Sequence, residues 1–155
     1  MDGAKNGVLA GIRRMACGIR RFEMSAIMDA FASKPSLLAG KGAPAEQISQ
    51  AEQDLGLSFS EEYREYLSSY GIVAFDGHEM TGLSKSKRLD VVSVTADARN
   101  RYPDLPSDLY VIEETGVEEL IILQNATGEV FGCAPNYPLE KVCDSLSDYV
   151  LGKRN

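Results

Sequence analysis

The chain contains 155 residues, of which 44% are hydrophobic and 25% are charged, and its formal net charge is −7. This length and composition predict one globular domain, and no apolar run approaches the roughly 20 residues that a membrane-spanning helix needs. An acidic chain repels nucleic acid phosphates, which disfavours DNA or RNA binding and favours basic protein partners. The three cysteines lack C-x-x-C spacing, so they indicate neither a disulfide framework nor a zinc site and suit a reducing cytoplasm.

The first 22 residues carry the opposite charge to the rest of the chain. They hold five Lys or Arg residues against one Asp, a balance of 5 − 1 = +4, which leaves −7 − 4 = −11 for residues 23–155. Residues 8–22 are compatible with a basic amphipathic helix, although internal glycines weaken it by about 1 kcal/mol each. A membrane-surface helix or an organellar presequence has this pattern, but we favour an extension ahead of a natural start at Met24. We expect residues 1–36 to be a basic extension and helix outside a core domain of residues 37–155.

Several later segments have helical periodicity. Residues 24–32 are compatible with a helix, and the proline- and glycine-containing residues 33–44 indicate a loop. An amphipathic helix that includes Ile48–Leu55 should end at Gly56, and Ser60 should cap a second helix with three tyrosines on its apolar stripe. Residues 91–101 predict another helix, and residues 145–151 predict a short terminal one.

Strand patterns fill the remainder of the chain. Residues 72–75 and 79–83 predict a hairpin around an Asp76-Gly77 turn. Residues 109–133 predict a three-stranded antiparallel meander with turns at Thr115-Gly116 and at Asn125–Gly128, and the apolar run of residues 121–123 marks the central strand. Pro135 and Pro138 interrupt the β pattern after the meander. The order of elements indicates an α+β domain, a small mostly antiparallel sheet packed against several helices.

Particular residues of these elements recur in a known order. The first block consists of Ile48, Ala51-Glu52, Leu55-Gly56, Tyr63-Arg64, Leu67 and Tyr70-Gly71. Later blocks are Gly82-Leu83, the helix from Val91-Val92 to Arg99, Tyr110–Ile112, Gly128–Val130 and Ser145–Tyr149. Over residues 37–151 this order resembles the SUKH superfamily, whose bacterial members include immunity proteins for secreted polymorphic toxins. The chain departs from the family where Ser60 replaces a usual proline, which preserves the ability to begin a helix.

The sequence contains no recognisable catalytic constellation. His78-Glu79 resembles the start of H-E-x-x-H, but the chain has no second histidine. Gly40-Lys41-Gly42 lacks the remaining residues of a phosphate-binding loop, and Cys133 and Cys143 are expected to act as small apolar residues. We therefore predict a protein that is not an enzyme and that has no metal site or cofactor.

Acidic residues gather near two predicted turns. Glu113, Glu114, Glu118 and Glu119 surround the expected Thr115-Gly116 tip, and Asp76 and Glu79 flank the other turn. Like charges at such a tip repel one another unless a basic group neutralises them, so this is either a solvated hairpin tip or a partner-binding edge. We name these six carboxylates as candidate toxin-binding residues.

The resemblance implies a cytoplasmic bacterial immunity protein that binds one cognate, basic toxin domain and neutralises it. A nuclease domain must be basic to hold phosphate, so an acidic inhibitor gains a fast encounter with it. The alternative is a non-catalytic binding or regulatory adaptor, because eukaryotic members of the superfamily act in signalling and cell-wall control.

Overall fold

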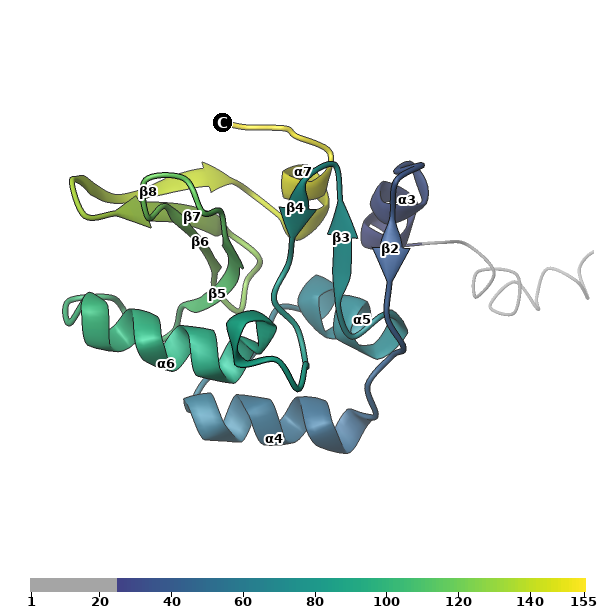
Figure 1. The fold of residues 1–155 in the computed structure, drawn as a ribbon, viewed down its shortest axis with the longest axis horizontal. Helices are drawn as coiled ribbons and strands as arrows, with labels where there is room; N and C mark the ends of the chain where they lie inside the picture. Colours follow the sequence, from purple (N-terminus) through teal and green to yellow (C-terminus); the bar gives the residue numbers. More distant parts are fainter. Residues whose placement is uncertain (1–24) are drawn as a thin grey trace, which may run out of the picture.

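The computed structural model describes residues 25–155, which form two antiparallel sheets and the helices around them (Figure 1). The helices are α3 (Ala26–Ala32), α4 (Ala45–Leu55), α5 (Glu61–Ser69), the 3-10 helix η1 (Lys87–Leu89), α6 (Val91–Arg101) and α7 (Leu146–Val150). The strands are β2 (Leu38–Ala39), β3 (Val73–Phe75), β4 (His78–Glu79), β5 (Tyr110–Glu114), β6 (Ile121–Gln124), β7 (Val130–Ala134) and β8 (Tyr137–Cys143). The helix expected over residues 8–22 lies outside the described residues.

The strands divide between a small sheet and a larger one. The small sheet has the order β2-β3-β4, and the larger one has the order β5-β6-β7-β8. Just beyond β4, Met80 bridges Glu113 and the Thr81 amide donates to the Ile112 carbonyl at 2.9 Å, so the two sheets are joined at β5. The α+β prediction is confirmed, and the antiparallel strands form two linked sheets in place of one.

The α4–α5 pair follows the capping signals in the sequence. Gly56 ends α4 with a φ of 68°, a left-handed conformation that glycine adopts at little cost. The Ser60 hydroxyl then accepts the Tyr63 amide at 3.1 Å and begins α5. Tyr63, Tyr66 and Leu67 turn into the core, so the predicted apolar stripe of α5 is confirmed.

The larger sheet has apolar residues on both faces. Val111, Ile121 and Leu123 pack against Val94 and Ala98 of α6 on one face. On the other face, Ile112, Ile122 and Val130 join the main core with residues of α3, α4, α5 and α7. The interior position of β6, which was predicted from its continuous apolar run, therefore follows from burial on both faces.

Two strands were not predicted. β2 lies in the segment expected to be a loop, and it pairs with β3 through Leu38 and Ala74. β8 contains Pro138, but it is the edge strand of the larger sheet, where a missing backbone donor breaks no ladder bond. The third difference is the connection between β5 and β6, which runs from Thr115 to Leu120 and is longer than the predicted Thr115-Gly116 tip.

Candidate functional site

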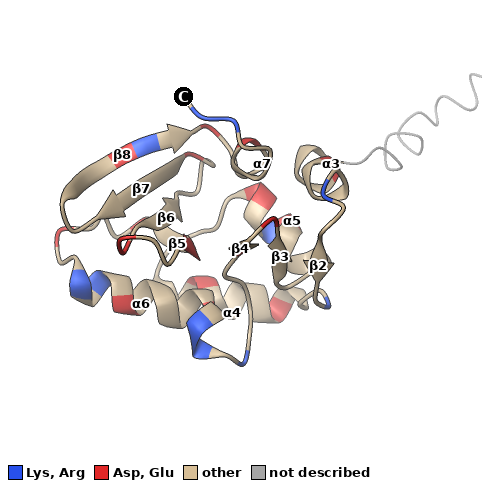
Figure 2. Cartoon of the chain, turned by 45° about the horizontal axis from the view of Figure 1, so that its top comes forward, with Lys and Arg blue, Asp and Glu red and all other residues tan. Residues whose placement is uncertain are grey.

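The six predicted carboxylates do not form one acidic face. Glu113 is buried, three others are engaged in ion pairs with nearby cations, and Glu118 and Glu119 share a turn. Figure 2 shows acidic residues spread over α4, α5, α6, β5 and β8. The residues that the structure describes carry 21 Asp or Glu and 11 Lys or Arg, a balance of 11 − 21 = −10.

Glu113 is only 3% exposed and links three elements, so its expected place at a solvated hairpin tip is wrong. Its carboxylate accepts the Tyr149 hydroxyl of α7 at 2.5 Å, and His78 Nδ1 of β4 lies 3.0 Å from both carboxylate oxygens. The physical reason is a β-bulge between Val111 and Glu113, which places Glu113 opposite Ile122 and turns it toward the main core. We call Glu113, His78 and Tyr149 the Glu113 cluster.

Two rings of the Glu113 cluster also contact neighbouring side chains. His78 stacks on Phe75 with ring centroids 5.1 Å apart, and Arg154 lies over the Tyr149 ring at 4.7 Å. Burial, and then the neighbouring Glu113 carboxylate, raise the pKa of Tyr149 well above its usual value. The cluster therefore holds β4, β5 and α7 together.

Three of the predicted carboxylates are held by cations on neighbouring elements. Asp76 pairs with Lys34 at 3.2 Å, and Glu114 pairs with Arg101 at 3.0 Å. Glu79 pairs with Arg88 at 2.8 Å, and that contact lowers the pKa of the Glu79 carboxyl. Glu79 and Glu114 both line one small pocket of about 200 Å³ that also contains Arg88. These side chains are already neutralised locally, which reduces their attraction for a distant basic protein.

Glu118 and Glu119 form the exposed turn between β5 and β6. Both have left-handed backbone conformations, with φ of 51° and 60°, and the Leu120 amide closes the turn on the Val117 carbonyl at 2.9 Å. Such conformations are costly for residues other than glycine. Within residues 25–155 neither carboxylate forms an ion pair. These two of the six predicted residues keep their charge available to solvent.

Among the described residues, no hydrogen bond joins His78 to a cysteine, since His78 Nδ1 contacts Glu113 and the Cys143 thiol donates to the Ser145 carbonyl. Cys133 and Cys143 are buried and free, and burial raises the pKa of both thiols, which disfavours the reactive thiolate. In the part of the chain that the structure describes, there is no group of three or more potential metal ligands, and no helix is long and apolar enough to cross a membrane.

A shallow groove of about 370 Å³ opens beside the Glu118 turn, on the larger sheet. We call it the hairpin groove, and its principal lining residues are Val117, Leu120, Gly132, Ala134, Tyr137 and Val142. Glu118 and Glu140 also line it. Tyr137 is 63% exposed and Val117 is 61% exposed, which is unusual for large apolar side chains. Sequence reasoning missed this groove, although the Pro-Asn-Tyr-Pro run places a tyrosine in a turn-like segment.

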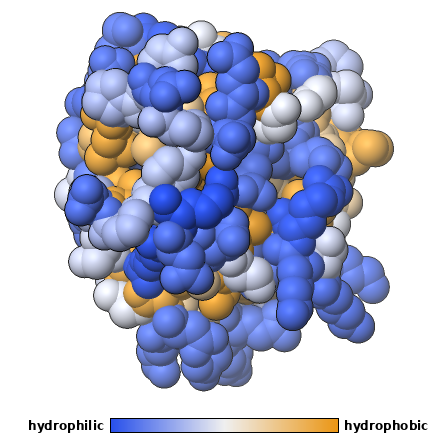
Figure 3. Space-filling view, turned by 60° about the vertical axis from the view of Figure 1, so that its left-hand side comes forward, coloured by the Kyte–Doolittle hydropathy of each residue, from blue (hydrophilic) through white to orange (hydrophobic). Residues whose placement is uncertain are grey.

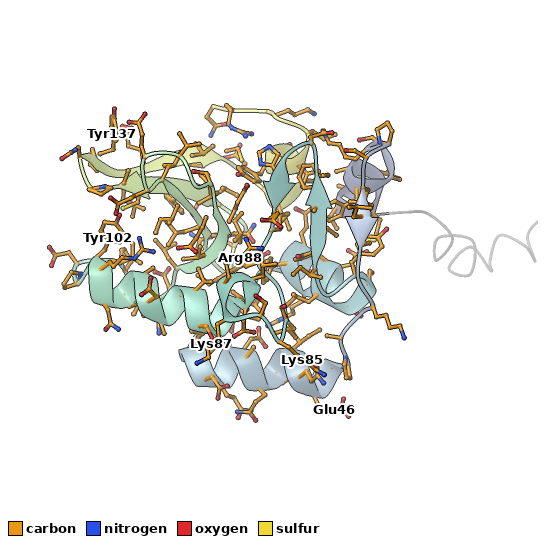
Figure 4. The ribbon with its side chains drawn as sticks, in the orientation of Figure 1. Glu46, Lys85, Lys87, Arg88, Tyr102 and Tyr137 are labelled. Carbon is orange, nitrogen blue, oxygen red and sulfur yellow. The ribbon has the colours of Figure 1, made fainter. Side chains whose placement is uncertain are left out.

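This end of the molecule carries a second pocket on the opposite face of the β7–β8 hairpin. It has a volume of about 450 Å³, and Tyr102 and Leu105 line it together with Tyr137 and Pro138. Figure 4 shows Tyr137 at the tip of the hairpin and Tyr102 below it at the end of α6. Figure 3 brings this side forward and shows apolar patches between hydrophilic residues. Tyr137 therefore belongs to both hollows.

The fold and these surfaces define a small α+β domain with shallow hollows, in which two buried side-chain atoms, Arg99 Nε and the Tyr102 hydroxyl, lack a hydrogen-bond partner among the described residues. The chain belongs to the SUKH family, because the family model SUKH_5, described as SMI1-KNR4 cell-wall, matches residues 24–151. SUKH domains are in general non-catalytic binding domains and include toxin immunity proteins. A comparison with curated proteins finds no match.

Proposed function

We propose that this protein is a cytoplasmic bacterial immunity protein that binds a cognate polymorphic toxin domain of the nuclease class and neutralises it. Membership of the SUKH family is the observation that carries this proposal, since that family includes toxin immunity proteins. The role requires no chemistry from the chain itself. A tight complex that covers the toxin's active site or its substrate path is sufficient.

The charge of the described residues supports a basic partner. Their balance of −10 opposes the positive surface that a nuclease needs for phosphate binding. Opposite charges speed the encounter of two proteins and allow an inhibitor to compete with the acidic substrate. Lasting protection in a cell requires affinity near the nanomolar range, about −12 kcal/mol, so packed apolar contacts must supply most of the binding free energy.

A regulatory adaptor is the second candidate, and the description of the matched family favours it. That description refers to the cell wall and not to toxins. An adaptor would bind a signalling or cell-wall partner through the same kind of shallow surface. The two candidates differ in what the partner does when the protein is absent.

Co-expression with the toxin domain encoded beside this gene tests the immunity function. We expect growth of the bacterial host to be restored, a one-to-one complex to form, and the purified toxin's cleavage of DNA or RNA to stop when the protein is added. A neighbouring gene without a toxin domain would favour the adaptor. Failure to bind a demonstrably active neighbouring toxin domain would contradict the immunity function.

A further inference from the structure

The hairpin groove exists because the helices cover only part of one sheet face. The main core includes Ile122 and Val130, but Leu120 and Val142 lie at its edge and are only partly buried. Gly132 lies between these two edge residues, and a Cβ added to it would lie 3.4 Å from Val142 Cγ2 and 3.6 Å from Leu120 Cδ1. The missing side chain at Gly132 therefore leaves room over an apolar floor.

Exposed apolar side chains border this floor. Val117 rises from the turn between β5 and β6, and Tyr137 rises from the β7–β8 hairpin. Both side chains are more than half exposed, although each could pack against a bound apolar group. An interface commonly places a few such side chains at its centre and surrounds them with polar residues.

The rim of the groove is acidic. Glu118 and Glu140 line it, and neither forms an ion pair with a cation among the described residues. The cation of the rim, Lys141, is already bound by Glu129 at 3.1 Å and by Asp144 at 2.6 Å. The apolar floor is therefore bordered by uncompensated negative charge, which distinguishes it from the neutralised surface around Asp76 and Glu79.

The neighbouring strand edge is poorly suited to pairing with another strand. β8 is the edge of the larger sheet, and Pro138, Glu140 and Lys141 interrupt it with a missing amide and two charges. The Asn155 amide also donates to the Val142 carbonyl at 2.8 Å, which covers the end of that edge. A partner is thus expected on the side-chain face of the hairpin, not as an added strand.

We propose that the hairpin groove is the docking site for the basic toxin domain, with an apolar side chain of the toxin over Gly132 and its Lys or Arg residues against Glu118 and Glu140. This assignment rests on the proposed immunity function. Charge complementarity favours this occupant over a second copy of the chain, since two acidic rims would repel each other. The groove is smaller than a complete interface, so it forms the centre of a larger contact surface.

Calorimetric titration of the purified toxin domain into the full chain tests the site. Gly132→Met should fill the groove and weaken binding by about 30-fold or more, and Tyr137→Ser should weaken it by about 10-fold. Leu38→Ser is the matched control because Leu38 is 71% exposed and lies on β2, far from the hairpin (Figure 1). It should leave the affinity unchanged. Circular dichroism and thermal unfolding identify any variant that has lost its fold. If Gly132→Met does not fold, Tyr137→Ser decides the outcome, because it alters an exposed side chain.

Each contrary outcome is distinct. Wild-type affinity in folded Gly132→Met and Tyr137→Ser would overturn the docking site while leaving the immunity function intact. Failure of the wild-type protein to bind the active toxin domain would overturn both. Sedimentation experiments could instead show a wild-type dimer that becomes monomeric in either groove variant. That result would assign the groove to a second copy of the chain and overturn the toxin assignment.

Discussion

The Glu113 cluster and the hairpin groove use the same residue type for opposite purposes. Glu113 is buried, accepts two side-chain partners and joins β4, β5 and α7. Glu118, only five positions later, projects from an exposed turn and forms no ion pair within the described residues. The number of carboxylates near a turn therefore does not define a binding face. What matters is which carboxylates the fold has already neutralised or enclosed.

High pH should weaken the buried region most strongly. Burial raises the pKa of Tyr63, Tyr66, Tyr110 and Tyr149 above the usual value near 10. The folded state therefore keeps protons that the unfolded state releases above pH 10, so this stability is present below pH 10 and falls as the pH rises. Each tyrosine contributes about 1.4 kcal/mol per pH unit, so the four together give a loss of about 6 kcal/mol by pH 11.

Urea unfolding between pH 8 and pH 11 measures this loss directly. In Tyr66→Phe the fall above pH 10 should be shallower than in the wild type, because one of the four buried tyrosines no longer titrates. The comparison uses slopes, since the variant also loses the hydrogen bond from the Tyr66 hydroxyl to the Thr81 carbonyl. Stability that stays constant through pH 11 would show that these hydroxyls are not enclosed as described.

Removing the Glu113 carboxylate should have the next largest effect. Glu113→Ala leaves the buried Tyr149 hydroxyl and His78 without their acceptor, which should lower the free energy of unfolding by about 3 kcal/mol. Glu113→Gln retains one acceptor oxygen and should cost less. Glu118→Ala is the matched control and should change stability by less than about 0.5 kcal/mol. Equal losses at the two positions would remove the distinction between the two regions.

Ser60 lies in a second buried polar network, and its loss should have a smaller effect. Its hydroxyl accepts the Tyr63 amide and donates to Gln124 Oε1 at 3.0 Å, while its amide donates to the Tyr110 hydroxyl. Ser60→Ala should therefore lower the free energy of unfolding by about 2 kcal/mol through loss of the cap and of one buried bond. Chemical denaturation checks this value against Thr127→Ala, an exposed hydroxyl on the β6–β7 turn. A loss no larger than that of the control would count against the capping role.

Local signals predicted the helices because their causes are local. The α4–α5 boundary follows from a glycine that adopts a left-handed conformation and a serine that caps the next turn, and both residues act within a few positions of themselves. The hairpin at Asp76-Gly77 is similar, since both turn residues have positive φ and the flanking Phe75 and His78 pair. Such features are predictable without knowledge of the rest of the fold.

The candidate site depended on features that are not local. The bulge that turns Glu113 inward arises from pairing with β6, and simple alternation cannot reveal it. Pro138 predicted an interruption of the β pattern, because proline is accepted in a strand mainly at a sheet edge. The edge position of β8 is a property of the whole sheet and cannot be seen in the local sequence. The turn at Glu118 and Glu119 lacks the glycine or asparagine that usually marks positive φ. The turn was therefore predicted at Thr115-Gly116, where a glycine is present. The ion pairs likewise join residues that are separated in the sequence but adjacent in the fold, and they determine which carboxylates remain uncompensated.

Charge-removing variants compare the uncompensated carboxylates of the hairpin groove with carboxylates that are already paired, and they disturb the structure least. Glu118→Gln with Glu140→Gln removes two charges from the groove, and Asp76→Asn with Glu79→Gln removes two from carboxylates that are already paired. The two double variants have the same net charge. Both should retain their stability within about 1 kcal/mol, as measured by thermal unfolding, because exposed charges contribute little.

The association rate of these two variants with the toxin domain, measured by stopped flow at low and high salt, tests the docking site most directly. At low salt the groove variant should associate about fivefold more slowly than wild type and lose much of its salt dependence, whereas the control variant should stay within about twofold of wild type. Equal slowing in both variants would show that net charge alone guides the encounter. A larger effect at Asp76 and Glu79 would place the toxin on the other end of the molecule and contradict the account.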